Sequence, residues 1–214
     1  MVNSRKRILG VILAGGQSRR FGANKAFIPF MGGQLIGHVI ARAAPQVDRL
    51  LISASDDPRF AAFGLSIVTD DVHESDGGQA GPLAGVLAAL DWLADGAPDT
   101  GWLATFSVDT PLIPMDLVAR LREMAERQEA VMACSQSAGR LHPLLSLWSP
   151  RLRDDLRAAL QRGERAVHRF AEQQRAVVVD YPVERFDPFA NINTPADLQH
   201  LAQQMAAQPG WNGG

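Results

Sequence analysis

The sequence predicts an α/β protein built on a three-layer, doubly wound and mostly parallel sheet. Short, apolar, β-branched runs such as residues 8–13 are typical of central strands that are covered on both faces. These runs alternate along the chain with segments of helical periodicity, and that alternation is typical of right-handed strand–helix–strand units. Because such sheets bind ligands at the carboxyl ends of their strands, we expect functional motifs directly after strands.

The first half of the chain follows this alternation without interruption. Pro82 can occupy the first turn of a helix, and apolar residues follow it at helical spacing up to Leu93. Pro111 and Pro114 break the chain before an amphipathic segment that carries Leu117, Val118, Leu121 and Met124. We expect strands at 8–13, 49–53, 65–69 and 102–108, and helices at 35–44, 82–93 and 117–124.

The pattern changes after Ala130. Two strand-like runs, 131–134 and 144–148, flank a turn at 137–139, which predicts a small hairpin-like insertion beside the main sheet. The rest of the chain predicts helices near 150–162 and 164–174, a strand at 177–179 and a last helix from Pro195. We expect a single domain over residues 1–207, followed by a disordered tail at 208–214.

Composition excludes several classes of function. With 46% apolar and 21% charged residues, the 214-residue chain is an ordinary globular protein. Its net charge of −2 provides no basic field for nucleic acid. Basic residues 5–7 before the apolar run 8–14 resemble a signal peptide, but glycines and arginines follow where a cleavage site should be. That run is too short to cross a membrane, and Cys134 has no partner for a disulfide, so we expect a cytoplasmic protein without membrane contact.

The segment from Leu13 to Lys25 has the composition of a phosphate-binding loop. It reads L-A-G-G-Q-S-R-R-F-G-A-N-K and directly follows the first strand. Glycines let backbone N–H groups approach an oxyanion, and Arg20 and Lys25 supply positive charge for a triphosphate. The segment is neither a Walker loop nor a dinucleotide-binding fingerprint. The alternative interpretation is a structural turn with solvated basic side chains.

Asp109 follows the predicted strand 102–108, at the edge where such sheets bind ligands. One or two carboxylates together with substrate phosphates suffice to bind Mg²⁺, so Asp109 is a candidate metal ligand. The alternative is that Asp109 only stabilises the turn through Thr110 and Pro111. His142 and His168 have no partner at metal-ligand spacing, and we interpret both as structural or surface residues rather than acids, bases or anion contacts.

Four blocks of sequence together resemble the molybdenum cofactor guanylyltransferase family over essentially the whole chain. The segment 13–25 is similar to the family's L-A-G-G-x-S-x-R-x-G block with its following lysine. Residues 81–85 (G-P-L-A-G) and 107–111 (S-V-D-T-P) resemble its second and third blocks, and residues 191–195 match its N-x-N-T-P block. The resemblance implies a Rossmann-like nucleotidyltransferase fold and an enzyme that transfers GMP from GTP to molybdopterin with Mg²⁺ and releases pyrophosphate.

The resemblance also implies roles for individual residues. Lys25, Asp109 and Arg20 correspond to the catalytic positions, and Asp109 to the metal ligand. Molybdopterin is expected to contact Asn191, Asn193 and Arg165. The nucleotide is expected to contact Leu13, Ala14, Gly15, Gly16, Ser18, Lys25, Ser53, Asp70, Pro82, Leu83 and Asp109. Transient contacts with other cofactor-biosynthesis proteins and with molybdoenzymes are also implied.

The chain departs from the family pattern at two positions. Asn24 replaces a common aspartate, and Ser53 replaces an asparagine that often contacts the nucleotide. The register also leaves open whether Asp70 or Asp71 makes the nucleotide contact. The alternatives to GMP transfer are transfer of CMP to molybdopterin, transfer to another phosphate acceptor, and a non-catalytic homologue that binds nucleotide or cofactor.

Overall fold

The computed structural model describes residues 7–15, 24–69, 81–96 and 100–207. Its strands are β1 (Arg7–Leu13), β2 (Pro29–Phe30), β3 (Gly33–Gln34), β4 (Arg49–Ser53), β5 (Ser66–Val68), β6 (Thr100–Ser107), β7 (Met132–Ser137), β8 (Arg140–Trp148) and β9 (Val177–Tyr181). Its α-helices are α1 (Leu35–Ala43), α2 (Pro82–Gly96), α3 (Leu117–Arg127), α4 (Arg153–Gln161), α5 (Val167–Gln173) and α6 (Pro195–Ala206). The elements lie close to the predicted positions.

Seven strands form one sheet in the order β5-β4-β1-β6-β8-β7-β9. Strands β5, β4, β1 and β6 pair in parallel, as do β7 and β9, whereas β8 is antiparallel to both of its neighbours. The chain first builds outward from β1 to β4 and β5, and then returns through α2 to place β6 on the other side of β1. The strand order therefore reverses between β1 and β6, and open α/β sheets bind ligands at such a reversal.

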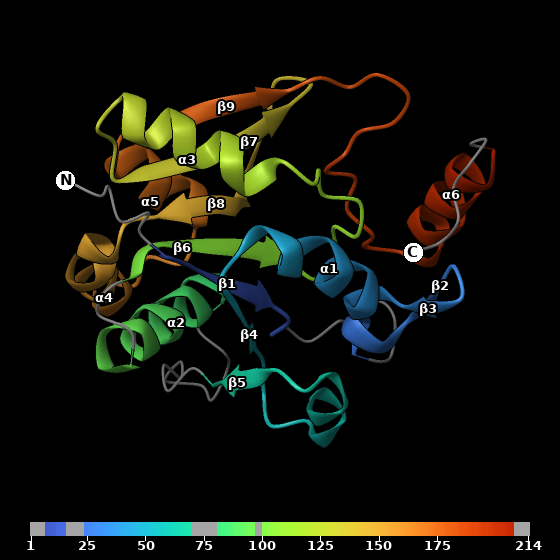
Figure 1. Ribbon diagram of the computed structural model, residues 1–214, viewed down its shortest axis with the longest axis horizontal. Coiled ribbons are helices and arrows are strands. Elements are labelled where there is room, and N and C mark those ends of the chain that lie inside the picture. The colour runs from blue at the N-terminus through green and yellow to red at the C-terminus, as the bar shows by residue number, and fades with distance from the viewer. Residues whose placement is uncertain (1–6, 16–23, 70–80, 97–99, 208–214) are drawn as a thin grey trace.

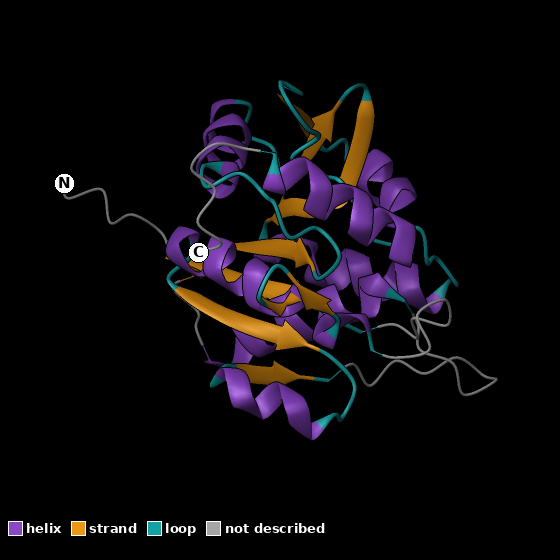
Figure 2. Cartoon of the chain, turned by 90° about the vertical axis from the view of Figure 1, so that its right-hand side faces the viewer, coloured by secondary structure: helices purple, strands orange, loops and turns teal. Residues whose placement is uncertain are grey.

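Helices cover both faces of the sheet, which confirms the predicted three-layer α/β class (Figures 1 and 2). Along β1, Ile8 and Ile12 belong to one apolar core, and Leu9, Val11 and Leu13 belong to the other. Helices α1 and α3 pack on the first face, and α2, α4 and α5 pack on the second. After Arg7, β1 carries only apolar side chains, because both faces of a central strand are buried.

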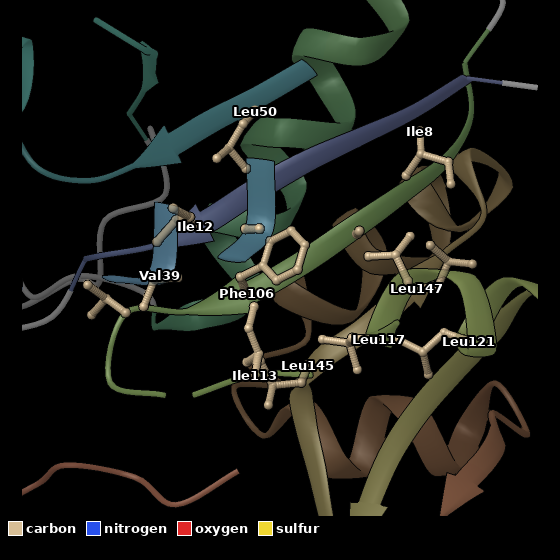
Figure 3. Close-up of a cluster of buried hydrophobic side chains, with 14 of the residues drawn as sticks. Ile8, Ile12, Val39, Leu50, Phe106, Ile113, Leu117, Leu121, Leu145 and Leu147 are labelled. Atoms are coloured by element: carbon tan, nitrogen blue, oxygen red, sulfur yellow. The ribbon is translucent and has the colours of Figure 1, made fainter. Parts of the chain in front are cut away.

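The apolar core between the sheet and helices α1 and α3 contains side chains from β1 and β6, the two strands between which the strand order reverses. Val39 from α1, Phe106 from β6 and Leu117 from α3 belong to this core (Figure 3). Phe106 and Leu117 are fully buried. Burying a side chain of this size stabilises the fold by about 1.5–3 kcal/mol, so this packing fixes the position of the end of β6.

The β7–β8 hairpin was correctly predicted, but its expected place beside the main sheet was wrong. Strand β8 pairs with β6 and β7 pairs with β9, so the hairpin continues the sheet. Ala138 and Gly139 form the two-residue turn, and both have positive φ angles of 47° and 74°. Two successive positive φ angles are the pattern of a type I′ turn, whose twist matches that of the strands it connects.

Helix α6 lies apart from the sheet and packs beside the β2–β3 ribbon (Figure 1). Leu201 and Met205 of α6 form a small third core with Phe30, Leu112 and Ile192. The helix begins with a capping box, in which Thr194 and Asp197 each accept a hydrogen bond from the other's backbone N–H. In the described part of the chain, every helix is too short or too polar to cross a membrane.

Candidate active site

The carboxyl ends of β1 and β6 lie side by side, because Leu13 pairs with Ser107 in the parallel register. The segments that follow these two strands bring Lys25 and Asp109 together, although 84 positions separate them in sequence. Lys25 Nζ lies 3.1 Å from Asp109 Oδ2 and 2.8 Å from Asn193 Oδ1. Three residues that were selected from separate sequence blocks therefore form one cluster at the reversal point.

The carboxylate of Asp109 is held by groups on both of its oxygens. Ser107 Oγ donates to Oδ1 over 2.6 Å, and Thr110 Oγ1 lies 3.2 Å from the same oxygen. Oδ2 faces Lys25, and the side chain as a whole is 18% exposed. Because hydroxyl groups on the adjacent residues fix Oδ1, the carboxylate presents its other oxygen in a defined direction.

The ammonium group of Lys25 is brought to this point by a short 3₁₀ helix, Lys25–Phe27. Asn24 caps that helix, since its Oδ1 accepts a hydrogen bond from the backbone N–H of Ala26. The Lys25 side chain is only 14% exposed. An ammonium group has three N–H donors, and among the described residues two of them have partners, Asp109 and Asn193.

The segment 191–194 is tied to Asp109 through backbone and side-chain contacts. The N–H of Ile192 donates to the carbonyl of Asp109 over 2.9 Å, and Thr110 Oγ1 lies 3.1 Å from Asn191 Oδ1. Asp197 accepts the N–H groups of Asn193 and Thr194 at 2.9 and 2.8 Å. The Asn193 bond, followed by the bonds to Thr194 and the charge of Lys25, lowers the pKa of Asp197.

A pocket of about 240 Å³ opens beside Asp109, and we call it the side pocket. Its lining combines apolar and polar side chains. Ser107 and Thr110, which contact the Asp109 carboxylate, line it together with Asn191, and Arg140 and His142 line it from β8. The other lining residues are Pro82, Leu141, Pro143, Leu144, Leu145 and Val167.

The predicted nucleotide loop is described only at its start. Ala14 donates its N–H to the carbonyl of Ser53 over 2.8 Å, and Leu13 accepts from Val108, so both residues extend the pairing of the sheet. The N–H of Ala14 is therefore not free for a phosphate, contrary to our expectation for the loop backbone. Gly15 is exposed. The predicted contacts Gly16, Ser18, Arg20 and Asp70 lie outside the described residues.

Ser53 and the start of α2 are packed tightly together. The Ser53 side chain is 3% exposed, and a methyl group added at Gly85 would lie well inside van der Waals contact with its hydroxyl. Pro82 is exposed at the first position of α2 and lines the side pocket. Leu83 is fully buried, backbone included, so its nucleotide contact stays a prediction. The nucleotide contact of Ser53 stays a prediction.

Arg165 lies in the connection between α4 and α5. Its guanidinium donates to the backbone carbonyls of Leu160 and Glu164, both at 2.9 Å. Asn191 and Asn193, the other two predicted molybdopterin contacts, instead contact Thr110 and Lys25. Two residues further along the chain, Val167 lines the side pocket.

Several residues of the site were not selected from the sequence. Ser107 and Thr110 flank Asp109 in the S-V-D-T-P block, and hydroxyls so close to a candidate metal ligand were a usable signal. Asp197 follows Thr194 by three positions, which is the spacing of a capping box. In the described ranges, no three side chains of the metal-binding types His, Cys, Asp and Glu gather. Asp109 therefore fits Mg²⁺ as a single carboxylate that acts with substrate phosphates.

Comparison with known proteins places this arrangement among nucleotidyltransferases. A family model described as a MobA-like NTP transferase domain matches residues 10–178. A molybdenum cofactor guanylyltransferase from Rhodopseudomonas palustris (strain BisB5) is 46% identical over 191 residues, which cover 88% of this chain and 89% of that protein. One from Bradyrhizobium sp. (strain ORS 278) is 44% identical over 201 residues, 92% of each protein. The crystal structure of molybdopterin-guanine dinucleotide biosynthesis protein A from Archaeoglobus fulgidus has a similar fold, with a TM-score of 0.70 at 24% identity, over 94% of this chain and 100% of that one.

Proposed function

The chain belongs to the family of MobA-like NTP transferases, and on that premise we propose that it transfers GMP from GTP to molybdopterin. The products are molybdopterin guanine dinucleotide and pyrophosphate. The observation that carries the proposal is the cluster of Lys25, Asp109 and Asn193 at the point where the strand order reverses. Two relatives over 40% identical, both molybdenum cofactor guanylyltransferases, support the choice of substrates.

In this reaction the chain must bring two anions together. An oxygen of the molybdopterin phosphate attacks the α-phosphorus of GTP, and the bond from that phosphorus to the oxygen of the leaving pyrophosphate breaks. No covalent enzyme intermediate is required, since the acceptor phosphate is itself the nucleophile. The protein therefore acts by positioning the two substrates and by offsetting negative charge.

Asp109 is the residue that would hold Mg²⁺. Its carboxylate is fixed by Ser107 and Thr110 on one oxygen, which leaves Oδ2 for a cation. That oxygen already faces a cation, the ammonium group of Lys25 at 3.1 Å. A bound Mg²⁺ would offset phosphate charge and stabilise the leaving pyrophosphate.

Lys25 supplies a mobile positive charge next to Asp109. We propose that its ammonium group leaves the Asp109 carboxylate when a nucleotide binds and then contacts the triphosphate. Asn193 accepts from the same ammonium over 2.8 Å and keeps it near the reaction centre during this exchange. The capping box of Thr194 and Asp197 fixes the backbone at Asn193, so it acts as a positioning device for Lys25.

The remaining nucleotide contacts are proposed from the family resemblance. Gly16, Ser18, Arg20 and Asp70 lie outside the described residues, and Gly15 lies exposed after β1. Pro82 and Leu83 stand at the start of α2, where the helix dipole favours a negatively charged group. The buried free thiol of Cys134 fits the reducing cytoplasm that we propose as the enzyme's location.

The test offers purified enzyme GTP and CTP together with molybdopterin and Mg²⁺. We expect one pyrophosphate per dinucleotide, and a product whose mass contains guanine rather than cytosine. A cytosine dinucleotide would replace our proposal with CMP transfer. Absence of any product from folded enzyme with intact substrates would instead indicate a nucleotide- or cofactor-binding protein. Omission of the divalent cation, with EDTA present, should abolish turnover.

A further inference from the structure

Three polar side chains form a network next to the side pocket, in which Ser137 and His142 are buried and Asp187 is half-buried. Ser137 Oγ donates to Asp187 Oδ1 over 2.7 Å, and the same hydroxyl lies 2.8 Å from His142 Nε2. Ser137 is fully buried, and His142 is 6% exposed. The His142 ring also packs against Phe189, with ring centroids 4.8 Å apart. These contacts hold the imidazole in one orientation.

The network fixes which nitrogen of His142 carries the proton. A hydroxyl has one proton, and the carboxylate of Asp187 can only accept it. Ser137 Oγ must therefore accept at its other contact, so His142 Nε2 is the donor. In a neutral imidazole the other nitrogen, Nδ1, then carries a lone pair. In the described part of the chain, Nδ1 has no hydrogen-bond partner.

The surroundings keep His142 neutral. Burial lowers the pKa of its imidazole below the ordinary value, opposed by the charge of Asp187 and assisted by that of Arg140. A buried acceptor without a partner is unfavourable, and buried polar groups are normally satisfied by protein, water or ligand. Because His142 lines the side pocket, a ligand in that pocket can reach it.

We propose that His142 Nδ1 accepts a hydrogen bond from a ring N–H of the pterin of the second substrate, and that it thereby determines acceptor specificity. This inference rests on the proposed transfer to molybdopterin. A pterin is a flat heterocycle with several N–H donors, and the side pocket is lined by apolar residues such as Leu144 and Val167 as well as by His142. Two further lining residues, Ser107 and Thr110, contact Asp109, where the acceptor phosphate must arrive.

Two substitutions at position 142 distinguish the donor role of Nε2 from the acceptor role of Nδ1. His142→Gln can retain a donor to Ser137 but has no acceptor at the position of Nδ1, whereas His142→Asn can retain that acceptor and loses the donor. We expect His142→Gln to raise KM for molybdopterin about 10-fold or more, as for a buried donor left without a partner, and to leave KM for GTP unchanged. His142→Asn should restore part of the loss. His168→Gln, at an exposed histidine of the same chain, is the matched control.

Direct binding of a fluorescent pterin monophosphate to enzyme without nucleotide makes the test independent of turnover. We expect the same order of affinities, with wild type and His168→Gln equal and His142→Gln weakest. If the probe binds in a way that depends on His142 but the enzyme forms no dinucleotide, the proposed transfer is wrong and the role of His142 in pterin binding is supported. Equal molybdopterin KM and probe affinity in folded His142→Gln, or no probe binding to wild type, would overturn it. If His142→Gln does not fold, Ser137→Ala replaces it in the same measurements, because loss of the Ser137 hydroxyl removes the contact that keeps the proton on His142 Nε2.

Discussion

Replacement of Asp109 by asparagine is the sharpest perturbation of the proposed mechanism, because it keeps the shape of the side chain and removes its charge. The oxygen of the amide can still accept from Ser107 and Thr110. The amide nitrogen then faces Lys25 Nζ, where the carboxylate oxygen stood 3.1 Å away, and two donors oppose each other. The variant therefore loses one of the two partners of Lys25 and the ligand that we assign to Mg²⁺.

The expected loss of activity exceeds the expected loss of stability. Removal of one preorganised electrostatic contact typically lowers the rate by about 10²–10³-fold, and Asp109 makes two, so we expect at least about 10³-fold, or about 4 kcal/mol in the barrier. The Lys25 and Asp109 side chains are 14% and 18% exposed, and Lys25 keeps Asn193. A partly solvated ammonium that loses one partner costs about 1–3 kcal/mol of the free energy of unfolding.

The assay is pyrophosphate release with saturating GTP, molybdopterin and Mg²⁺, together with urea unfolding of each variant. Asp116→Asn is the matched control, since Asp116 is an exposed aspartate shortly after the same strand and its side chain makes no cap hydrogen bond. We expect the control to keep its rate within about twofold, as for a surface substitution of this kind. A folded Asp109→Asn enzyme with wild-type kcat would refute the role of Asp109.

Three further predictions concern the framework around the site. Gly85→Ala should lower the free energy of unfolding by about 1–2 kcal/mol in a urea titration, because its methyl group overlaps the Ser53 hydroxyl, and Ser53→Ala in the same chain should recover most of the loss. Ala138→Asn should raise that free energy by about 0.5–1 kcal/mol, since asparagine tolerates the left-handed φ of 47° better, and an unchanged urea midpoint would contradict a strained turn. Burial raises the pKa of Cys134 to about 11, so only about one thiol in a thousand is ionised at pH 8, and iodoacetamide should label the protein in urea but not the native fold.

Much of the fold could be predicted from local patterns in the sequence. The run at β1 is apolar at every position from Ile8 to Leu13 apart from Gly10, and both faces of that strand are buried. Helix α3 has one apolar face, and Pro195 correctly marked the first turn of α6. Such signals depend only on neighbours in sequence, so one chain is sufficient to find them.

Pairings between distant strands could not be predicted in the same way. The β7–β8 hairpin has the same local pattern whether it lies beside the sheet or within it, and only its contacts with β6 and β9 decide between them. The β2–β3 ribbon has two residues in each strand, which is too short for any periodicity. Its pairing is visible only in three dimensions.

The sequence analysis selected the charged residues of the site but not the residues that hold them in place, such as Ser107 and Thr110. Lys25, Asp109 and Asn193 were selected from three sequence blocks, and the structure places them in contact. His142 was interpreted as structural, because its network with Ser137 and Asp187 joins residues up to 50 positions apart. Ser53 was expected to face the nucleotide, and its close approach to Gly85 depends on how α2 crosses the sheet.

The most direct test of the central claim is a crystal structure of this protein with GTP and Mg²⁺. We predict a metal ion bonded to the Asp109 carboxylate, with the Lys25 ammonium moved from that carboxylate onto the triphosphate and still close to Asn193. The side pocket should remain open for the second substrate. Phosphates and metal bound away from Lys25 and Asp109, with the pair between them still intact, would contradict the account.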